Sequence, residues 1–144
     1  QEKQKLADVF RKYCAAVGEN GDAEQAAELA RQLEALDVRD ADLLNEIAWH
    51  VLTGDGIRQR DRPLATRLAE KAMELSEYKN ANILDTYARA LFDNGLVAVA
   101  IEYQKKAVAA APDDREIAAT LDRYLAAAET LPDVDPTDPF PPAD

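Results

Sequence analysis

The sequence predicts an all-α protein, an α-solenoid of three helical hairpins followed by a C-terminal capping helix. The first observation is composition: 47% of the 144 residues are hydrophobic, only 6% are aromatic, and alanine is abundant. Alanine has the highest helix propensity and lets helices approach closely, which favours a closely packed helical fold. The second observation is that apolar residues recur at helical spacing along most of the chain. The third is that no run of alternating Val, Ile or Thr is bounded by turn residues, so strand signals are nearly absent.

Residues 1–36 are predicted to form the first hairpin. Its first helix has one apolar face, formed by Leu6, Val9, Phe10, Tyr13, Cys14 and Val17. Residues 18–22 supply the turn, and Asp22 has a side chain suited to the N-cap of the next helix. The apolar face of that second helix consists of Ala26, Leu29, Ala30, Leu33 and Leu36.

A second hairpin is predicted after this one. Asp40 or Asp42 is expected to cap its first helix, whose apolar residues are Leu43, Leu44, Ile47, Ala48, Val51 and Leu52. A long loop spans residues 54–62, and Pro63 suits the first turn of the fourth helix because proline is tolerated there. The apolar residues of the fourth helix are Leu64, Leu68, Ala69, Ala72, Met73 and Leu75.

The third hairpin, over residues 80–112, has the clearest pattern. Its first helix presents Ile83, Leu84, Tyr87, Ala88 and Leu91 as one continuous apolar stripe. Asp93-Asn94-Gly95 interrupts the pattern, because Gly and Asn tolerate the left-handed conformation that ends a helix. The second helix repeats the stripe with Val97, Ala100, Ile101, Ala107 and Val108, and Pro112 ends it.

A single amphipathic helix is predicted after Pro112. Its apolar residues are Ile117, Leu121, Tyr124, Leu125 and Ala128. A hairpin of this size cannot bury its stripe alone, so hairpins must stack, and a last single helix covers the exposed end of the stack. The predicted helical repeat domain therefore covers residues 1–129.

Residues 130–144 have a different composition. They contain five of the seven prolines, four aspartates and no basic residue. Such a segment cannot continue a helix or form a core, so we expect a disordered or extended tail. Because the chain begins at Gln1 rather than Met, it is expected to be an excised domain or a processed fragment.

The charge of the chain restricts its partners. The formal net charge is -11 at pH 7, and the sequence pI is about 4.5. An acidic surface repels phosphate backbones and anionic lipids, so no nucleic-acid partner is expected. The sequence contains no run of 18 apolar residues, so no membrane insertion is expected either.

The chain contains an internal repeat. Residues 43–56 align with residues 83–95 at an offset of 40, and Ala65 and Ala72 align with Ala100 and Ala107 at an offset of 35. The difference corresponds to an insertion in the loop after Gly54. Ala26 precedes Ala65 by 39 residues, which places the first hairpin in the same frame.

On these residues the chain resembles the tetratricopeptide repeat family. The third hairpin matches the family pattern at Leu84, Tyr87, Ala88, Leu91, Ala100, Ala107 and Pro112, but Gln104 stands where the family has an aromatic residue. The second hairpin matches at Leu44, Ile47, Ala48, Val51, Ala65 and Ala72, but has Glu77 in place of the proline. The first matches least, at Phe10, Tyr13, Cys14, Val17 and Ala26, with Leu33 where the second alanine belongs. A helical bundle or another α-solenoid is the alternative.

The resemblance implies a concave groove that binds a partner peptide or helix. The matching groove positions are Asp42, Asn45, Trp49, Leu52, Asn82, Asp85, Arg89 and Phe92, followed by Glu116 and Arg123 in the last helix. Trp49 and Arg89 are of the residue types that carry most binding energy at interfaces, although Trp49 could instead pack between hairpins. The lysine–asparagine clamp by which some family members hold a chaperone's C-terminal carboxylate is not expected. Asp85 stands at a position that would need a basic or amide residue, and no lysine accompanies Asn45.

Two further features bear on partners and location. Asn45–Trp49 and Leu84–Leu91, with the basic loop between them, also resemble helical modules at the C-terminus of some bacterial thioredoxin-fold proteins, which would imply an envelope location. Without such a domain, a cytoplasmic location stays open.

The loop residues Arg58, Arg60 and Arg62, with Arg67 close by, form the one basic cluster of an acidic chain. This cluster could hold an acidic partner segment, even the chain's own tail, or simply be a solvated loop.

The sequence contains few residues suited to catalysis, so no enzyme activity, cofactor or metal site is expected. His50 is the only histidine, and although Glu46 lies one turn before it, no third ligand follows. Cys14 is the only cysteine; it lies on an apolar face without an adjacent base and is expected to be a buried small hydrophobe. The sequence therefore predicts a non-enzymatic module that binds a protein or peptide partner. The alternatives are a structural spacer that self-associates and an accessory that positions clients for a thioredoxin-like domain.

Overall fold

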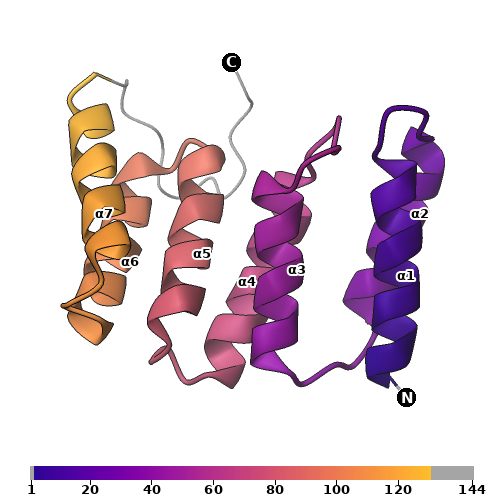
Figure 1. Ribbon diagram of the computed structural model, residues 1–144, viewed down its shortest axis with the longest axis horizontal. Helices are drawn as coiled ribbons and strands as arrows, with labels where there is room; N and C mark the ends of the chain where they lie inside the picture. Colours follow the sequence, from indigo (N-terminus) through magenta and orange to yellow (C-terminus); the bar gives the residue numbers. More distant parts are fainter. Residues whose placement is uncertain (1, 131–144) are drawn as a thin grey trace.

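A computed structural model describes residues 2–130 of the chain, and within them the fold is entirely helical (Figure 1). The helices are α1 (Glu2–Ala16), α2 (Ala23–Ala35), α3 (Ala41–Thr53), α4 (Arg62–Leu75), α5 (Ala81–Asp93), α6 (Val97–Ala110) and α7 (Arg115–Ala128). The predicted all-α class is confirmed. Apart from Thr130, the predicted tail lies outside the described residues.

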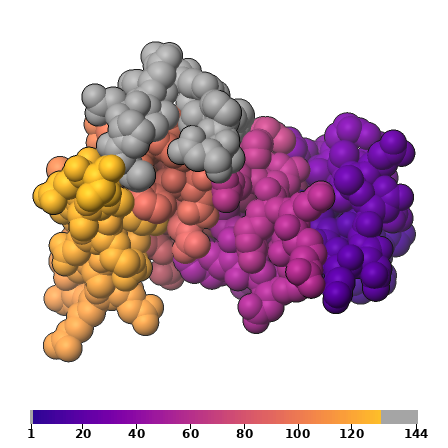
Figure 2. Space-filling view, turned by 90° about the horizontal axis from the view of Figure 1, so that it is seen from above, coloured from indigo at the N-terminus to yellow at the C-terminus, as the bar shows by residue number. Residues whose placement is uncertain are grey.

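The helices are arranged as a row of hairpins with one extra helix at the end. Consecutive helices pair as α1 with α2, α3 with α4 and α5 with α6, and α7 packs on α6. In Figure 1, α1, α3, α5 and α7 lie side by side toward the viewer, with α2, α4 and α6 behind them. Seen from above in Figure 2, the first hairpin and α7 lie at opposite ends of an elongated body. None of the helices in residues 2–130 has both the length and the apolar character needed to cross a membrane.

Side-chain caps fix where most helices begin. The carboxylates of Asp22, Asp61 and Asp114 each accept hydrogen bonds from backbone N–H groups in the first turn of α2, α4 and α7. Asp40 rather than Asp42 caps α3, accepting from the N–H of Leu43 at 3.1 Å, because its extended backbone places the carboxylate over the first turn. Each cap satisfies an N–H group that has no partner within its helix.

The turn between α5 and α6 depends on glycine. Gly95 has φ of +86°, a left-handed conformation that glycine adopts without steric cost. The next N–H, of Leu96, then reaches back to the carbonyl of Leu91 at 2.9 Å, which closes the end of α5. The predicted break at residues 93–95 therefore coincides with the observed end of the helix.

The core is built on close helix contacts at alanine. The completely buried alanines, all 0% exposed, are Ala48, Ala65, Ala69, Ala72, Ala88, Ala90, Ala100 and Ala107. Larger side chains fill the space around them, including Leu44, Leu64, Ile83 and Leu84. A methyl group keeps adjoining helix backbones close together, so the position of each helix follows from where its alanines fall.

Three expectations about the core are wrong. Cys14 is half-buried rather than buried, because it borders a hollow between α1 and α3. In α7 only Ile117 and Tyr124 are buried, while Leu125 is 41% exposed, because α6 and the Phe92 ring of α5 cover only part of this helix. Gln104 is completely buried in α6, whereas Ile101 and Val108 of the predicted stripe are only partly buried.

The alanine contacts generate the first prediction. Ala100→Leu should lower the free energy of unfolding by about 1–3 kcal/mol, because extra methylene groups have no space in a packed core. The matched control is Ala109→Leu on the exposed side of the same helix, which should stay within about 0.5 kcal/mol of the wild type. Urea unfolding followed by circular dichroism measures both. Equal stability of the two variants would show that close packing at Ala100 does not position α6.

Candidate functional site

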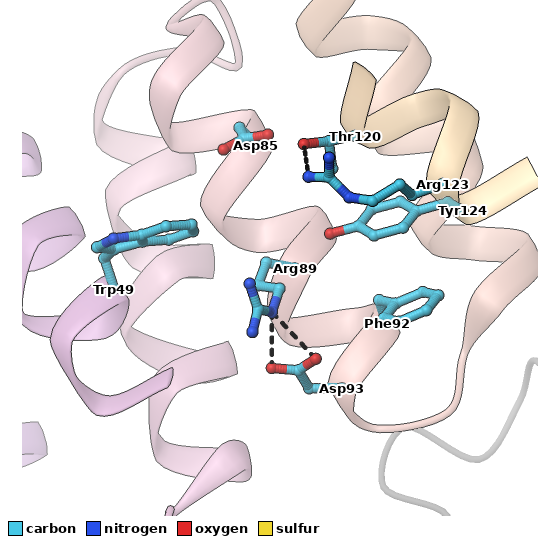
Figure 3. A pocket seen from close by; sticks show the side chains of 8 residues that line it. All are labelled: Trp49, Asp85, Arg89, Phe92, Asp93, Thr120, Arg123 and Tyr124. Carbon is cyan, nitrogen blue, oxygen red and sulfur yellow. Dashed lines mark hydrogen bonds and ion pairs between the residues drawn. The ribbon is translucent and has the colours of Figure 1, made fainter. Parts of the chain in front are cut away.

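A hollow of about 260 Å³ opens where α3, α5 and α7 lie next to one another. Its lining residues come from all three helices: Trp49, Asp85, Arg89, Phe92, Asp93, Thr120, Arg123 and Tyr124. Figure 3 shows Trp49 on one side and Phe92 and Tyr124 on the other, with Asp85 toward one end and the Arg89–Asp93 pair toward the opposite end. The hollow is large enough for about one side chain, since a cavity of about 150 Å³ accommodates benzene.

Helical spacing places the α5 residues on one face. Asp85, Arg89 and Phe92 stand at i, i+4 and i+7, so they project from the same side of the helix. The opposite side of α5 is buried in the core, where Ala88 and Leu91 pack. On α7, Thr120, Arg123 and Tyr124 follow the same spacing rule and face α5 across the hollow.

The two arginines of the hollow are held differently. Arg89 donates through Nε to both carboxylate oxygens of Asp93, at 3.1 and 3.0 Å. Its guanidinium carbon also lies 5.9 Å from the centroid of the Trp49 ring, at the outer limit of a cation–π contact. Arg123 instead donates to the hydroxyl of Thr120 at 2.7 Å, and within residues 2–130 it makes no salt bridge. Arg123 is therefore the cation that a bound acidic group would meet.

A buried amide links the hollow to the core. Gln104 donates from Nε2 to Oδ1 of Asp85 at 2.8 Å and to the carbonyl oxygen of Ile117 at 3.0 Å. These two bonds connect α6 to both α5 and α7. Partial burial raises the pKa of the Asp85 carboxyl, and nearby Asp114 adds to this effect, against the opposing hydrogen bond from Gln104 and the charges of Arg123 and Arg89. The departure from the tetratricopeptide pattern at Gln104 thus coincides with a specific hydrogen-bonded bridge.

Two aromatic rings form the side of the hollow opposite Trp49. Phe92 and Tyr124 are stacked, with ring centroids 4.3 Å apart and an interplanar angle of 11°. Burial raises the pKa of the Tyr124 hydroxyl to about 12, so this side stays uncharged. The stacked pair joins α5 to α7 and leaves Trp49, at 40% exposed, as the most accessible aromatic surface of the hollow.

The structure brings together only part of the predicted groove. Trp49, Asp85, Arg89 and Phe92 line the hollow, and Arg123 joins them. The prediction for Leu52 is wrong: this side chain is 2% exposed, because it packs in the core on the far side of α3. The remaining predicted residues, which lie outside the hollow, are Asp42, Asn45, Asn82 and Glu116.

These remaining residues have different surroundings. Asp42 and Asn82 are exposed in the first turns of α3 and α5. Asn45 is half-buried, and its Oδ1 is buried without a hydrogen-bond partner among the described residues.

Asp93, Thr120 and Tyr124 line the hollow but were not predicted. Asp93 was detectable in principle, because it stands at i+4 from Arg89, the spacing of a helical ion pair. Tyr124 was assigned only to the apolar face of the last helix, and its ring does pack there against Phe92.

The predicted basic loop is largely engaged in the fold. Arg60 donates to the carbonyl oxygens of Val51 and Gly54 at 3.0 and 2.7 Å, and so satisfies the end of α3. Arg58 lies 3.6 Å from Glu19, and its backbone N–H bonds to the Val17 carbonyl. Arg62 begins α4 and is half-buried. The loop therefore ties the second hairpin to the first, and its binding of an acidic segment stays a prediction.

A second hollow, of about 600 Å³, lies between α1 and α3 and is lined by the single cysteine and the single histidine of the sequence. Cys14, Glu46 and His50 are all part of its lining. Partial burial raises the pKa of the Cys14 thiol, which disfavours the reactive thiolate. The His50 ring packs edge-on against Phe10, with centroids 5.5 Å apart. In residues 2–130 no group of three or more His, Cys, Asp or Glu residues is arranged to hold a metal ion.

Comparisons with protein-family models, curated proteins and solved structures found no match. The hollow offers aromatic surface, a partly buried carboxylate and, among the described residues, one cation without a salt bridge.

Burial of Asp85 gives a prediction about pH. Because the folded state raises the pKa of Asp85, this group lowers stability as the pH rises through that pKa. Asp85→Asn removes the ionisation and can still accept the Gln104 hydrogen bond, so it should be more stable than the wild type at pH 7. The gain should disappear below pH ~4, where the carboxyl is protonated in the unfolded chain as well.

Urea unfolding of the two proteins at pH 7 and pH 3.5 measures this difference. Asp122→Asn, at an exposed position of α7, is the control and should change stability by no more than about 0.5 kcal/mol. An Asp85→Asn variant that is less stable than the wild type at pH 7 would show that the charged carboxylate stabilises the fold.

Proposed function

We propose that this chain is a non-enzymatic protein-interaction module that binds an extended segment of a partner in the hollow between α3, α5 and α7. The observation that carries this proposal is the convergence of Trp49, Arg89 and Arg123 from three helices on one hollow. Trp and Arg are the residue types most enriched among residues that dominate binding energy.

The hollow suits a partner side chain that is apolar and has an acidic neighbour. Trp49 and the Phe92–Tyr124 stack offer apolar surface on two sides, and the volume of about 260 Å³ fits about one side chain. Arg123 can donate to a carboxylate beside that side chain, because its hydrogen bond among the described residues is to the neutral hydroxyl of Thr120. The rest of the partner segment would run along the surface formed by α3, α5 and α7.

We also propose that the three hairpins are tetratricopeptide-like repeats. The small residues of the family pattern in the second and third hairpins, such as Ala48, Ala65 and Ala100, are all completely buried between helices. The helices that would line the groove, α3, α5 and α7, are the ones that form the hollow. These features support the repeat without identifying the partner.

The third prediction tests the hollow as a binding site. Peptides selected from a random display library with the wild-type protein should bind the double variant Trp49→Ala, Arg89→Ala far more weakly. Truncating one dominant contact residue costs at least about 2 kcal/mol, or roughly 30-fold in Kd. Isothermal titration calorimetry measures the affinities, and circular dichroism checks that helicity is kept.

The matched control replaces one exposed aromatic residue and one exposed arginine elsewhere. Tyr78 is 51% exposed in the turn before α5, and Arg115 is exposed at the start of α7; neither lines the hollow. Tyr78→Ala, Arg115→Ala should bind the selected peptides like the wild type. If the peptides bind both double variants equally well, the hollow is not the binding site.

A further inference from the structure

The hydroxyl of Tyr124 points into the hollow between α3, α5 and α7 and has no hydrogen-bond partner among the described residues. The side chain is only 4% exposed, and its ring stacks on Phe92. Figure 3 shows the hydroxyl directed into the hollow, between Asp85 and Arg89. A polar group on a side chain buried this deeply is expected to have a partner, so we expect a ligand of the hollow to form a hydrogen bond here.

Asp85 supplies a second polar group of the hollow. Its Oδ1 accepts from Gln104 at 2.8 Å, while within residues 2–130 its Oδ2 accepts no hydrogen bond. The Tyr124 hydroxyl stays protonated, because burial above all, and the charge of Asp85 among other groups, raises its pKa to about 12. A ligand therefore meets a hydroxyl that can donate and a carboxylate oxygen that can accept.

The charges of the lining disfavour a charged ligand group at this place. The four charged lining residues are two aspartates and two arginines: Asp85, Asp93, Arg89 and Arg123. A ligand carboxylate here would be repelled by Asp85, and a ligand ammonium group would be repelled by Arg89. A neutral group that both donates and accepts suits Asp85 and Tyr124 together, and a hydroxyl does so with a single oxygen atom.

The sides of the hollow favour an aromatic ring as the carrier of this hydroxyl. Trp49 lies on one side and the Phe92–Tyr124 stack on the other, and aromatic rings pack favourably against one another. A serine or threonine would leave most of the volume of about 260 Å³ unfilled. An asparagine or glutamine has no ring, and a tryptophan has a donor but no acceptor for the hydroxyl of Tyr124.

We propose that the partner residue bound in this hollow is a tyrosine. This inference rests on the proposed function of the hollow as a site for a partner segment, and it identifies the side chain that the site selects. The ring of this largely apolar side chain packs against Trp49, while its hydroxyl donates to Asp85 and accepts from Tyr124. A phenylalanine would exclude water from both polar groups without replacing their hydrogen bonds, so the site discriminates against it.

The fourth prediction compares tyrosine with phenylalanine in the peptides selected from the display library. Replacing the tyrosine of a selected peptide by phenylalanine should weaken its binding to the wild-type protein about tenfold, because Asp85 and Tyr124 lose their partner. With the variant Tyr124→Phe, this preference should fall to about threefold or less, since only the bond to Asp85 remains. Isothermal titration calorimetry of the two peptides with the two proteins measures both ratios.

Two controls separate recognition from an effect on folding. Tyr124→Phe keeps the stacked rings and removes no hydrogen bond of the described residues, so urea unfolding should show no loss of stability. Tyr103→Phe is the matched variant, because Tyr103 is half-buried, packs edge-on against Tyr87 and does not line the hollow. It should keep the full preference for tyrosine. A preference that stays tenfold in Tyr124→Phe would overturn the inference.

A second measurement needs no selected peptide. Trp49 is the only tryptophan of the chain, so its indole N–H gives a single NMR signal that reports on the hollow. N-acetyltyrosinamide should shift this signal at about tenfold lower concentration than N-acetylphenylalaninamide, and Tyr124→Phe should reduce that difference. Equal shifts by the two amides in the wild-type protein would contradict the assignment of tyrosine.

The outcomes separate this inference from the proposed function. If selected peptides bind in a Trp49-dependent way but contain no tyrosine, or bind equally well with phenylalanine in its place, the hollow is a partner site and the assignment of tyrosine is wrong. If the two amides show the preference but no peptide binds, recognition of the phenol hydroxyl stands and binding of a partner segment is wrong. Equal shifts by the amides together with no bound peptide would overturn both.

Discussion

Close contact between helices at alanine is the constraint on which this structure depends. Ala65, Ala88 and Ala100 have no exposed surface, and alanine at a helix contact allows the adjoining backbones to approach closely. This closeness keeps α3, α5 and α7 side by side in the front row (Figure 1). Only because these helices are adjacent do Trp49, Arg89 and Arg123, which are far apart in the sequence, line one hollow.

Gln104 shows how a polar group refines this arrangement. A buried amide is costly unless its hydrogen bonds are made. Gln104 makes two through Nε2, to Asp85 on α5 and to the Ile117 carbonyl on α7, while its Oε1 is buried without a partner among the described residues. A phenylalanine at this place would fill volume but could not donate a hydrogen bond to the Asp85 carboxylate. The bridge therefore fixes α5 relative to α7 at the end of the hollow where Asp85 lies, while the stacked rings of Phe92 and Tyr124 join the same two helices elsewhere.

Local signals in the sequence predicted the helices well, because caps and breakers act over a few residues. Asp22, Pro63 and Gly95 each stand where the pattern placed a helix boundary. The resemblance to tetratricopeptide repeats assigned Asp85, Arg89 and Phe92 to the groove, and these three line the hollow, although their role in binding stays a prediction. Leu52 was assigned to the same groove and lies in the core. Which side of α3 is buried depends on how this helix packs against α4 and α5, and the period of a single helix does not specify that packing.

The hollow is electrostatically asymmetric, and this asymmetry determines how a segment can lie in it. Arg89 is paired with Asp93 within its own helix, so an acidic ligand would have to displace a carboxylate that is already in place. Binding of an anionic group to Arg123 costs less free energy, because it replaces only a hydrogen bond to the neutral hydroxyl of Thr120. An anionic group is therefore favoured on the α7 side and an apolar group on the Trp49 side. A segment that carries both an anionic and an apolar group can therefore bind in the hollow in one orientation only. The arrangement of charges determines this orientation, and Trp49 provides contact area.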